Sequence, residues 1–202
     1  HVVELDTESV DFLVTEELLP SERVHGVDLL SWNPDMAFPN NKPFIVAGNF
    51  PYNISSQILF QVIDWRERVP ELVGMFQKEV AQRIAEGPGS RTYGILSVLL
   101  QTYYDIEYLF TVDEDAFDPP PRVKSGVIRL LRNDMIDPGC SFLHLKRVVK
   151  GAFNQRRKTL RNALSSAGFA EEMIPKEFLK KRAEQLSPKE FHILAIALIP
   201  TS

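Results

Sequence analysis

Blocks of apolar residues separated by polar turns predict strands that alternate with helices over the first two thirds of the chain. The expected strands are residues 2–5, 24–30, 44–48, 71–76, 104–110 and 123–131, and the expected helices are residues 10–18, 58–65, 78–86 and 93–103. This alternation is typical of an α/β domain with a largely parallel sheet. Ser55 or Ser56 is expected to cap the second of these helices.

The pattern changes in the last third of the chain. Residues 141–200 show helical periodicity only, and residues 137–139 (Asp-Pro-Gly) have the composition of a linker. The last helix should begin at residue 187, where an N-capping serine is followed by proline and then, three positions after the serine, by glutamate. We therefore predict an α/β domain over residues 1–134 and a small helical domain over residues 135–202.

Charge divides the chain at the same place. Residues 1–134 carry 11 Lys and Arg against 21 Asp and Glu, a net charge of −10. Residues 135–202 carry 12 against 6, a net charge of +6, so the total of −4 conceals a strong contrast. A contrast of this kind favours two domains and a nucleic-acid partner for the basic one. The alternative is a basic helical surface that is merely solvated.

Seven basic residues lie within residues 146–161, a stretch that contains no acidic residue. They are Lys146, Arg147, Lys150, Arg156, Arg157, Lys158 and Arg161. With apolar positions between them, they predict a helical surface that binds the phosphate backbone of a nucleic acid and positions it without reading its sequence.

The composition, with 44% hydrophobic and 25% charged residues, is that of an ordinary globular protein. No apolar stretch is long enough to span a bilayer and no secretory signal stands at the start, so we expect a cytoplasmic protein without a membrane partner. The single cysteine, Cys140, fits a reducing compartment. The four histidines lack metal-ligand spacing, so no metal is expected.

The main candidate site is Asn49-Phe50-Pro51-Tyr52, directly after the buried strand 44–48. Ligands of open α/β sheets bind outside the carboxyl ends of the strands. The Asn49 side-chain oxygen and a nearby backbone carbonyl, such as that of Phe50, can accept both hydrogens of an exocyclic amine. Pro51 stiffens the turn, and Tyr52 offers a face on which a base can stack. This combination predicts an enzyme that methylates the amine of a nucleobase by alignment, and an ordinary turn is the alternative.

Three further residues are candidates because of their positions. Glu4, at the end of the first strand, could accept hydrogen bonds from two ribose hydroxyls, although a surface acid is the alternative. Asp28 could accept from an adenine amine or cap a helix. Phe117 precedes a stiff proline-rich loop (118–121) and could stack on the base from the other side, or could anchor the loop.

Taken in order, these segments resemble the ribosomal RNA adenine dimethyltransferase family, close to the bacterial enzymes that modify two adjacent adenines near the 3′ end of small-subunit rRNA. One motif, Asn49–Ser56, is similar to the family's Asn-Leu-Pro-Tyr-Asn-Ile-Ser-Ser, with Phe50 in place of leucine. The other matching segments are Val3–Asp6, Asp28–Leu30, Gln77–Ile84, Tyr93–Val98, Ala116–Val123, Ala152–Leu160 and Arg182–Ser187.

The resemblance implies a Rossmann-like methyltransferase domain followed by a small all-α domain. It implies S-adenosylmethionine as cofactor and two methyl groups on each of two adenines of small-subunit rRNA, in an immature ribosomal particle. The catalytic residues would be Asn49, Phe50, Pro51, Tyr52 and Phe117. Glu4, Asp28 and Asn49 would bind the cofactor. We expect a monomer.

The chain departs from the family at its start. It has no initiator methionine, and the glycine-rich Gly-x-Gly-x-Gly loop that precedes the ribose-binding acid in the family is absent. We therefore expect a fragment with an incomplete cofactor pocket, and its own activity stays open. The alternatives to a small-subunit enzyme are a non-catalytic ribosome-assembly factor, a DNA-directed relative and a large-subunit rRNA adenine methyltransferase. The segment 182–187 argues against the last of these.

Overall fold

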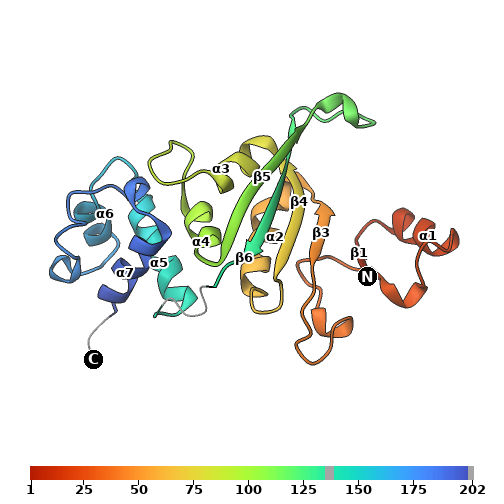
Figure 1. Ribbon diagram of the computed structural model, residues 1–202, viewed down its shortest axis with the longest axis horizontal. Helices are drawn as coiled ribbons and strands as arrows, with labels where there is room; N and C mark the ends of the chain where they lie inside the picture. Colours follow the sequence, from red (N-terminus) through yellow and green to blue (C-terminus); the bar gives the residue numbers. More distant parts are fainter. Residues whose placement is uncertain (135–138, 200–202) are drawn as a thin grey trace.

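The structure, a computed structural model, describes residues 1–134 and 139–199. Its strands form a two-stranded sheet, β1-β2, and a four-stranded sheet in the order β3-β4-β6-β5 (Figure 1). The strands are β1 (Val2–Glu4), β2 (Val24–Gly26), β3 (Val46–Asn49), β4 (Glu71–Gln77), β5 (Tyr104–Val112) and β6 (Ser125–Arg132). All six predicted strands are present, but β2 is shorter than predicted. It ends at Gly26 because the chain turns there, with the N–H of Val27 donating to the His25 carbonyl at 3.0 Å.

The prediction of a largely parallel sheet is wrong for half of the strand pairs. β1 with β2 and β3 with β4 are parallel, whereas β6 is antiparallel to both of its neighbours, β4 and β5. The reason is that β6 follows β5 through a loop that reverses the chain, without a crossover helix. The start of β6 therefore lies beside the carboxyl end of β4, where Ser125 pairs with Gln77. Because β3 and β4 are parallel, the end of β3 lies at this same edge of the sheet.

Helices follow the strands as the sequence predicts, with small differences at their ends. In the first part of the chain they are α1 (Thr7–Thr15), α2 (Ser55–Asp64), α3 (Lys78–Ala85) and α4 (Ile95–Tyr103). Short 3₁₀ segments are η1 (Ser21–Arg23), η2 (Pro34–Met36), η3 (Tyr52–Ile54), η4 (Glu114–Ala116), η5 (Glu171–Met173) and η6 (Ala183–Gln185). The core lies between α2, α3 and α4 and the four-stranded sheet, where Ile58, Leu99, Leu72 and Ile128 are fully buried.

After Arg132 the described residues form helices and turns, without a further strand. These helices are α5 (Phe142–Asn154), α6 (Leu160–Ser166) and α7 (Pro188–Ala197). α5 and α7 pack on α4 (Figure 1). Between α5 and α7, the Phe153 and Phe191 rings stack with their centroids 5.8 Å apart. The predicted start of the last helix is confirmed, since the Ser187 hydroxyl accepts from the Glu190 N–H. The Asp-Pro pair of the predicted linker lies outside the described residues. Within the described ranges, no helix is long and apolar enough to cross a bilayer.

Candidate active site

Asn49 is the last residue of β3, and the chain turns sharply after it. The next residue, Phe50, still donates its N–H to the Met75 carbonyl of β4, at 3.2 Å. Its ring is only 7% exposed and stacks on Phe76, with the centroids 5.1 Å apart. Phe50 therefore anchors the turn through both its backbone N–H and its buried ring.

Glycines make room for this large ring where the family motif has leucine. A Cβ added at Gly48 would lie 3.1 Å from Cε1 of Phe50, and one added at Gly74 would lie 2.6 Å from its Cε2. The aromatic ring of Phe50 thus fills space that side chains at these two strand positions would otherwise occupy.

The rest of the turn is held by hydrogen bonds from Ser55. Its buried hydroxyl reaches the carbonyls of Pro51 at 3.3 Å and Tyr52 at 3.0 Å. The prediction that Ser55 or Ser56 caps the following helix is wrong, because α2 begins at Ser55 and Ile54 occupies the N-cap position without a side-chain bond. The serine instead fixes the conformation of the turn that carries Asn49.

The turn borders a cavity of about 360 Å³, at the carboxyl end of β3. Its lining combines the turn with the loop that precedes β6: Asn49, Phe50, Pro51, Tyr52, Phe117, Pro119 and Pro121. All five residues predicted to be catalytic on the basis of the family motif are therefore brought to one cavity. A cavity of this volume lies within the range of small-molecule sites and could admit a nucleobase.

Within this cavity, the Asn49 amide is available to a ligand. The residue is exposed, and its side-chain amide forms no hydrogen bond with the described part of the chain. Tyr52 and Phe117 are each partly buried and supply aromatic surface from two different elements. The phenol oxygen of Tyr52 lies 2.5 Å from the hydroxyl oxygen of Ser125 at the start of β6. The arrangement offers an amide acceptor beside two aromatic rings, as recognition of a base with an exocyclic amine requires.

Glu4 and Asp28, predicted to bind the cofactor, lie elsewhere, at the carboxyl ends of β1 and β2. Oε1 of Glu4 accepts from the N–H groups of Leu5 and Asp6 at 2.8 and 2.9 Å. Oδ1 of Asp28 accepts from the Leu30 N–H at 2.9 Å. Each carboxylate is thus held by one oxygen while its second oxygen stays available, so the two residues fit a ribose diol and an adenine amine. Neither of them lines the cavity beside Asn49.

The predicted basic surface is divided, because several of its members bind other parts of the protein. Nη2 of Arg156 donates to the carbonyls of Arg91 and Tyr93, at 2.5 and 2.8 Å. Arg161 forms an ion pair with Glu171 at 2.8 Å. The two remaining members with internal contacts lie over aromatic rings: Lys146 over Phe60 and Phe142, and Arg147 over Phe169.

Lys150, Arg157 and Lys158 are exposed and have no ion pair within the described residues. These three residues are the ones whose charge is most available to a phosphate backbone. Sequence reasoning treated the seven cations alike, because their spacing does not show which of them meet a carbonyl or a ring in the folded chain.

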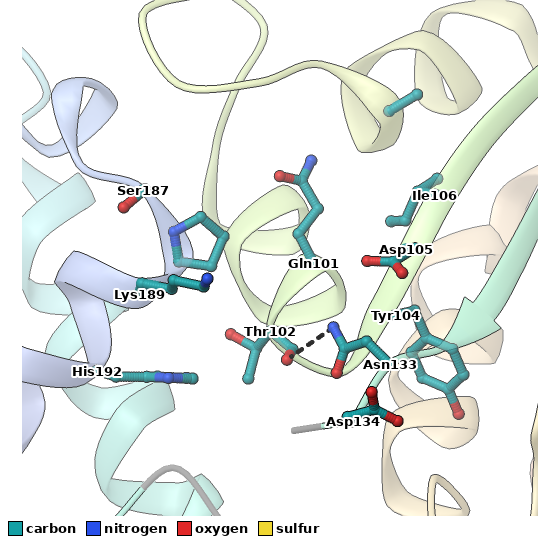
Figure 2. Close-up of a pocket in the computed structure, with 12 residues that line it drawn as sticks. Gln101, Thr102, Tyr104, Asp105, Ile106, Asn133, Asp134, Ser187, Lys189 and His192 are labelled. Carbon is teal, nitrogen blue, oxygen red and sulfur yellow. Dashed lines mark hydrogen bonds between the residues drawn. The ribbon is translucent and has the colours of Figure 1, made fainter. Parts of the chain in front are cut away.

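A larger cavity of about 770 Å³ lies between α4, the start of β5 and α7, and none of the predicted residues lines it (Figure 2). It is bordered by Gln101, Asp105, Lys189 and His192 among others, and burial lowers the pKa of His192. Size alone does not make it the site. None of the residues of the Asn49–Tyr52 turn lines it, whereas the smaller cavity is lined by that turn together with Phe117. No cluster of metal-binding side chains occurs in residues 1–134 and 139–199.

The fold is that of the Rossmann-like methyltransferases. It is similar to a dimethyladenosine transferase from Plasmodium falciparum, with a TM-score of 0.77, 21% identity and coverage of 95% of this chain and 78% of the other. It is also similar to the 23S rRNA methyltransferase ErmE, with a TM-score of 0.69, 20% identity and coverage of 97% and 80%.

The family described as "Ribosomal RNA adenine dimethylase" matches residues 1–199, and this chain belongs to that family. Its relatives include bacterial proteins named "Ribosomal RNA small subunit methyltransferase A". The protein from Cytophaga hutchinsonii is 52% identical over 197 residues, and the match covers 94% of this chain and 73% of the length of the relative. The protein from Porphyromonas gingivalis is 52% identical over 201 residues, and the match covers 98% of this chain and 77% of the length of the relative. The sequence-based resemblance is thereby confirmed.

Proposed function

We propose that this protein transfers methyl groups from S-adenosylmethionine to the exocyclic amines of two adjacent adenines near the 3′ end of small-subunit rRNA. Membership of the adenine dimethylase family and the names of the relatives support this reaction. The structural observation that supports it is the exposed Asn49 amide beside Tyr52 and Phe117 in one cavity.

The residues of this cavity have distinct roles in the proposed reaction. The Asn49 side-chain oxygen and the Phe50 carbonyl accept the two amine hydrogens and orient the nitrogen lone pair. Tyr52 and Phe117 hold the base plane between them, and the prolines keep the loop rigid. Alignment of this kind contributes strongly to rate. The adenine must leave its stack, which costs a few kcal/mol unless it is already unpaired.

Glu4 and Asp28 would hold the ribose and adenine of S-adenosylmethionine, the cofactor of this family. When bound, it supplies an electrophilic methyl group. The chain's own contribution is to present the amine nitrogen and to restrain its hydrogens.

Lys150, Arg157 and Lys158 would contact the rRNA backbone, which they position without reading its sequence. We also propose that the substrate is an immature small-subunit particle, that the protein acts as a monomer, and that it works in the cytoplasm. Recognition should depend on the shape of the rRNA more than on its sequence.

The test is methyl incorporation by the natural protein that contains residues 1–202. Unmethylated small subunits, large subunits and duplex DNA are each incubated with methyl-labelled S-adenosylmethionine. We expect dimethyladenosine near the 3′ end of small-subunit rRNA only. Label in large-subunit rRNA or in DNA would overturn the substrate, and no label in any of the three would overturn the enzymatic function.

The alternative of a non-catalytic assembly factor is tested in cells that carry Asn49→Ala. If cellular function is lost together with methylation, binding alone does not account for the role of the protein. If the variant supports normal subunit assembly without methylating, the assembly role is the principal one.

A further inference from the structure

Ser125, the first residue of β6, is polar yet fully buried, with 0% of its surface exposed. Its hydroxyl oxygen lies 2.5 Å from the phenol oxygen of Tyr52, 73 residues earlier in the chain. A buried hydroxyl has a strong requirement for a partner, because leaving it unsatisfied costs free energy. Tyr52 supplies this partner for Ser125, so the two side chains constrain each other.

This hydrogen bond joins the two walls of the 360 Å³ cavity. Tyr52 belongs to the turn after β3, and Ser125 begins the strand that directly follows the loop bearing Phe117, Pro119 and Pro121. Ser125 itself does not line the cavity. Its position is fixed by the sheet, since it pairs with Gln77 of β4 and with Val112 of β5. A rigid strand therefore holds the phenol end of a ring whose face borders the cavity.

Within the turn, no other hydrogen bond restrains the phenol group of Tyr52. The hydrogen bonds of Ser55 hold the backbone carbonyls of Pro51 and Tyr52. They leave the side-chain torsions of Tyr52 free to change. A partly exposed tyrosine with an unbound phenol can adopt other rotamers, and each of them would alter the surface offered to a base.

We propose that Ser125 is a positioning residue for methyl transfer. Its hydroxyl holds the Tyr52 ring in the orientation that stacks on the target adenine opposite Phe117, and so keeps the amine beside the Asn49 amide. The identity of the base rests on the proposed function above. The hydrogen bond and its effect on the Tyr52 ring do not.

The test is a double-mutant cycle of Tyr52→Phe, Ser125→Ala and the double variant in the natural protein that contains residues 1–202. Each single variant should lower kcat with small-subunit rRNA about fivefold, the usual effect of one hydrogen bond. The double variant should be no worse than the more severe single variant. The Kd for rRNA should change less than about twofold, because phosphate contacts dominate binding.

Ser97→Ala is the matched control. Ser97 is also fully buried, and its hydroxyl donates to the Arg83 carbonyl at 2.6 Å, away from the cavity. This variant should lower the melting temperature and leave kcat unchanged. Multiplicative losses of kcat in the Tyr52 and Ser125 variants, or an equal loss in Ser97→Ala, would overturn the proposal.

A second measurement separates this inference from the proposed function. A small-subunit rRNA hairpin carries 2-aminopurine at each target adenine in turn, and its emission at saturating protein reports stacking of that base. Both single variants should give brighter emission per bound RNA than wild type, since a loosely held ring quenches less. Equal emission in wild type and in both variants would overturn the positioning role, whether or not the wild-type protein methylates.

Discussion

Replacing Gly74 with alanine should destabilise the protein and disturb the candidate site, because the added methyl group has no room. A Cβ at Gly74 would lie 2.6 Å from Cε2 of Phe50 and 2.8 Å from Cε2 of Phe76. Both rings are buried and stacked on each other, so neither can turn into solvent. Since Phe50 directly follows Asn49 in the turn, a shift of its ring moves the amide as well.

Overpacking of this kind costs about 1–3 kcal/mol. A loss of about 2 kcal/mol should lower the melting temperature by about 4–8 °C in a protein of this size. Urea unfolding measures the free energy, and methyl incorporation per folded molecule measures the effect on the site. The control is Gly87→Ala, since a Cβ there meets nothing within 4 Å. Surface substitutions usually change the free energy of unfolding by no more than about 0.5 kcal/mol. If Gly74→Ala changes it by no more than this, the added methyl group has room and the packing argument is wrong.

Two further predictions concern the helical part of the chain. Arg156→Ala removes hydrogen bonds to two backbone carbonyls and should cost about 1–3 kcal/mol in urea unfolding. Arg157 is also exposed but has no ion pair within the described residues, so Arg157→Ala should leave stability unchanged and weaken rRNA binding in a filter assay, with a shallower salt dependence. If instead Arg157→Ala lowers stability and Arg156→Ala weakens only rRNA binding, the assignment of a structural role to Arg156 and an rRNA-binding role to Arg157 is wrong. The Lys181 ammonium donates to Glu190 and holds the pKa of that carboxyl below its ordinary value of 4.5. Ionised Glu190 therefore stabilises the fold above about pH 4.5, and this contribution is lost as the pH falls through the lowered folded-state pKa. Glu190→Gln should cost up to about 0.5 kcal/mol at pH 7 and progressively less as the pH falls below 4.5, as measured by urea unfolding across pH. A cost independent of pH would refute the role of charge.

The order and type of most elements could be predicted from the sequence, because apolar periodicity reports which face of a strand or helix is buried. The direction of β6 could not be predicted in this way. Its apolar pattern is the same whether it runs parallel or antiparallel, and the deciding factor is the short connection from β5. The early end of β2 was also missed, since Val27 and Leu29 continue the apolar run after the backbone has turned.

The contiguous motif at the end of β3 and Phe117 could be named from the sequence as candidates, and they line one cavity, whereas a contact between residues far apart in the chain could not be predicted. Asn49 to Tyr52 form one motif at a strand end, and Phe117 was found only through its position before the prolines. Ser125 gave no signal, because one serine before an apolar strand is common. Pro119 and Pro121 were recognised as stiffening residues, but their place in the cavity wall depends on how β6 folds back.

The proposed reaction depends on the Asn49 amide, which orients the target amine for methyl transfer. Single-turnover transfer with saturating rRNA and S-adenosylmethionine isolates this step when wild type is compared with Asn49→Ala and with Asn162→Ala, an exposed residue that does not line the cavity. Asn49→Ala should slow transfer by about 100-fold or more, as loss of a preorganised polar contact does, with folding and rRNA affinity intact. Asn162→Ala should match wild type. Transfer by Asn49→Ala at a rate within about threefold of wild type would show that this amide does not orient the amine.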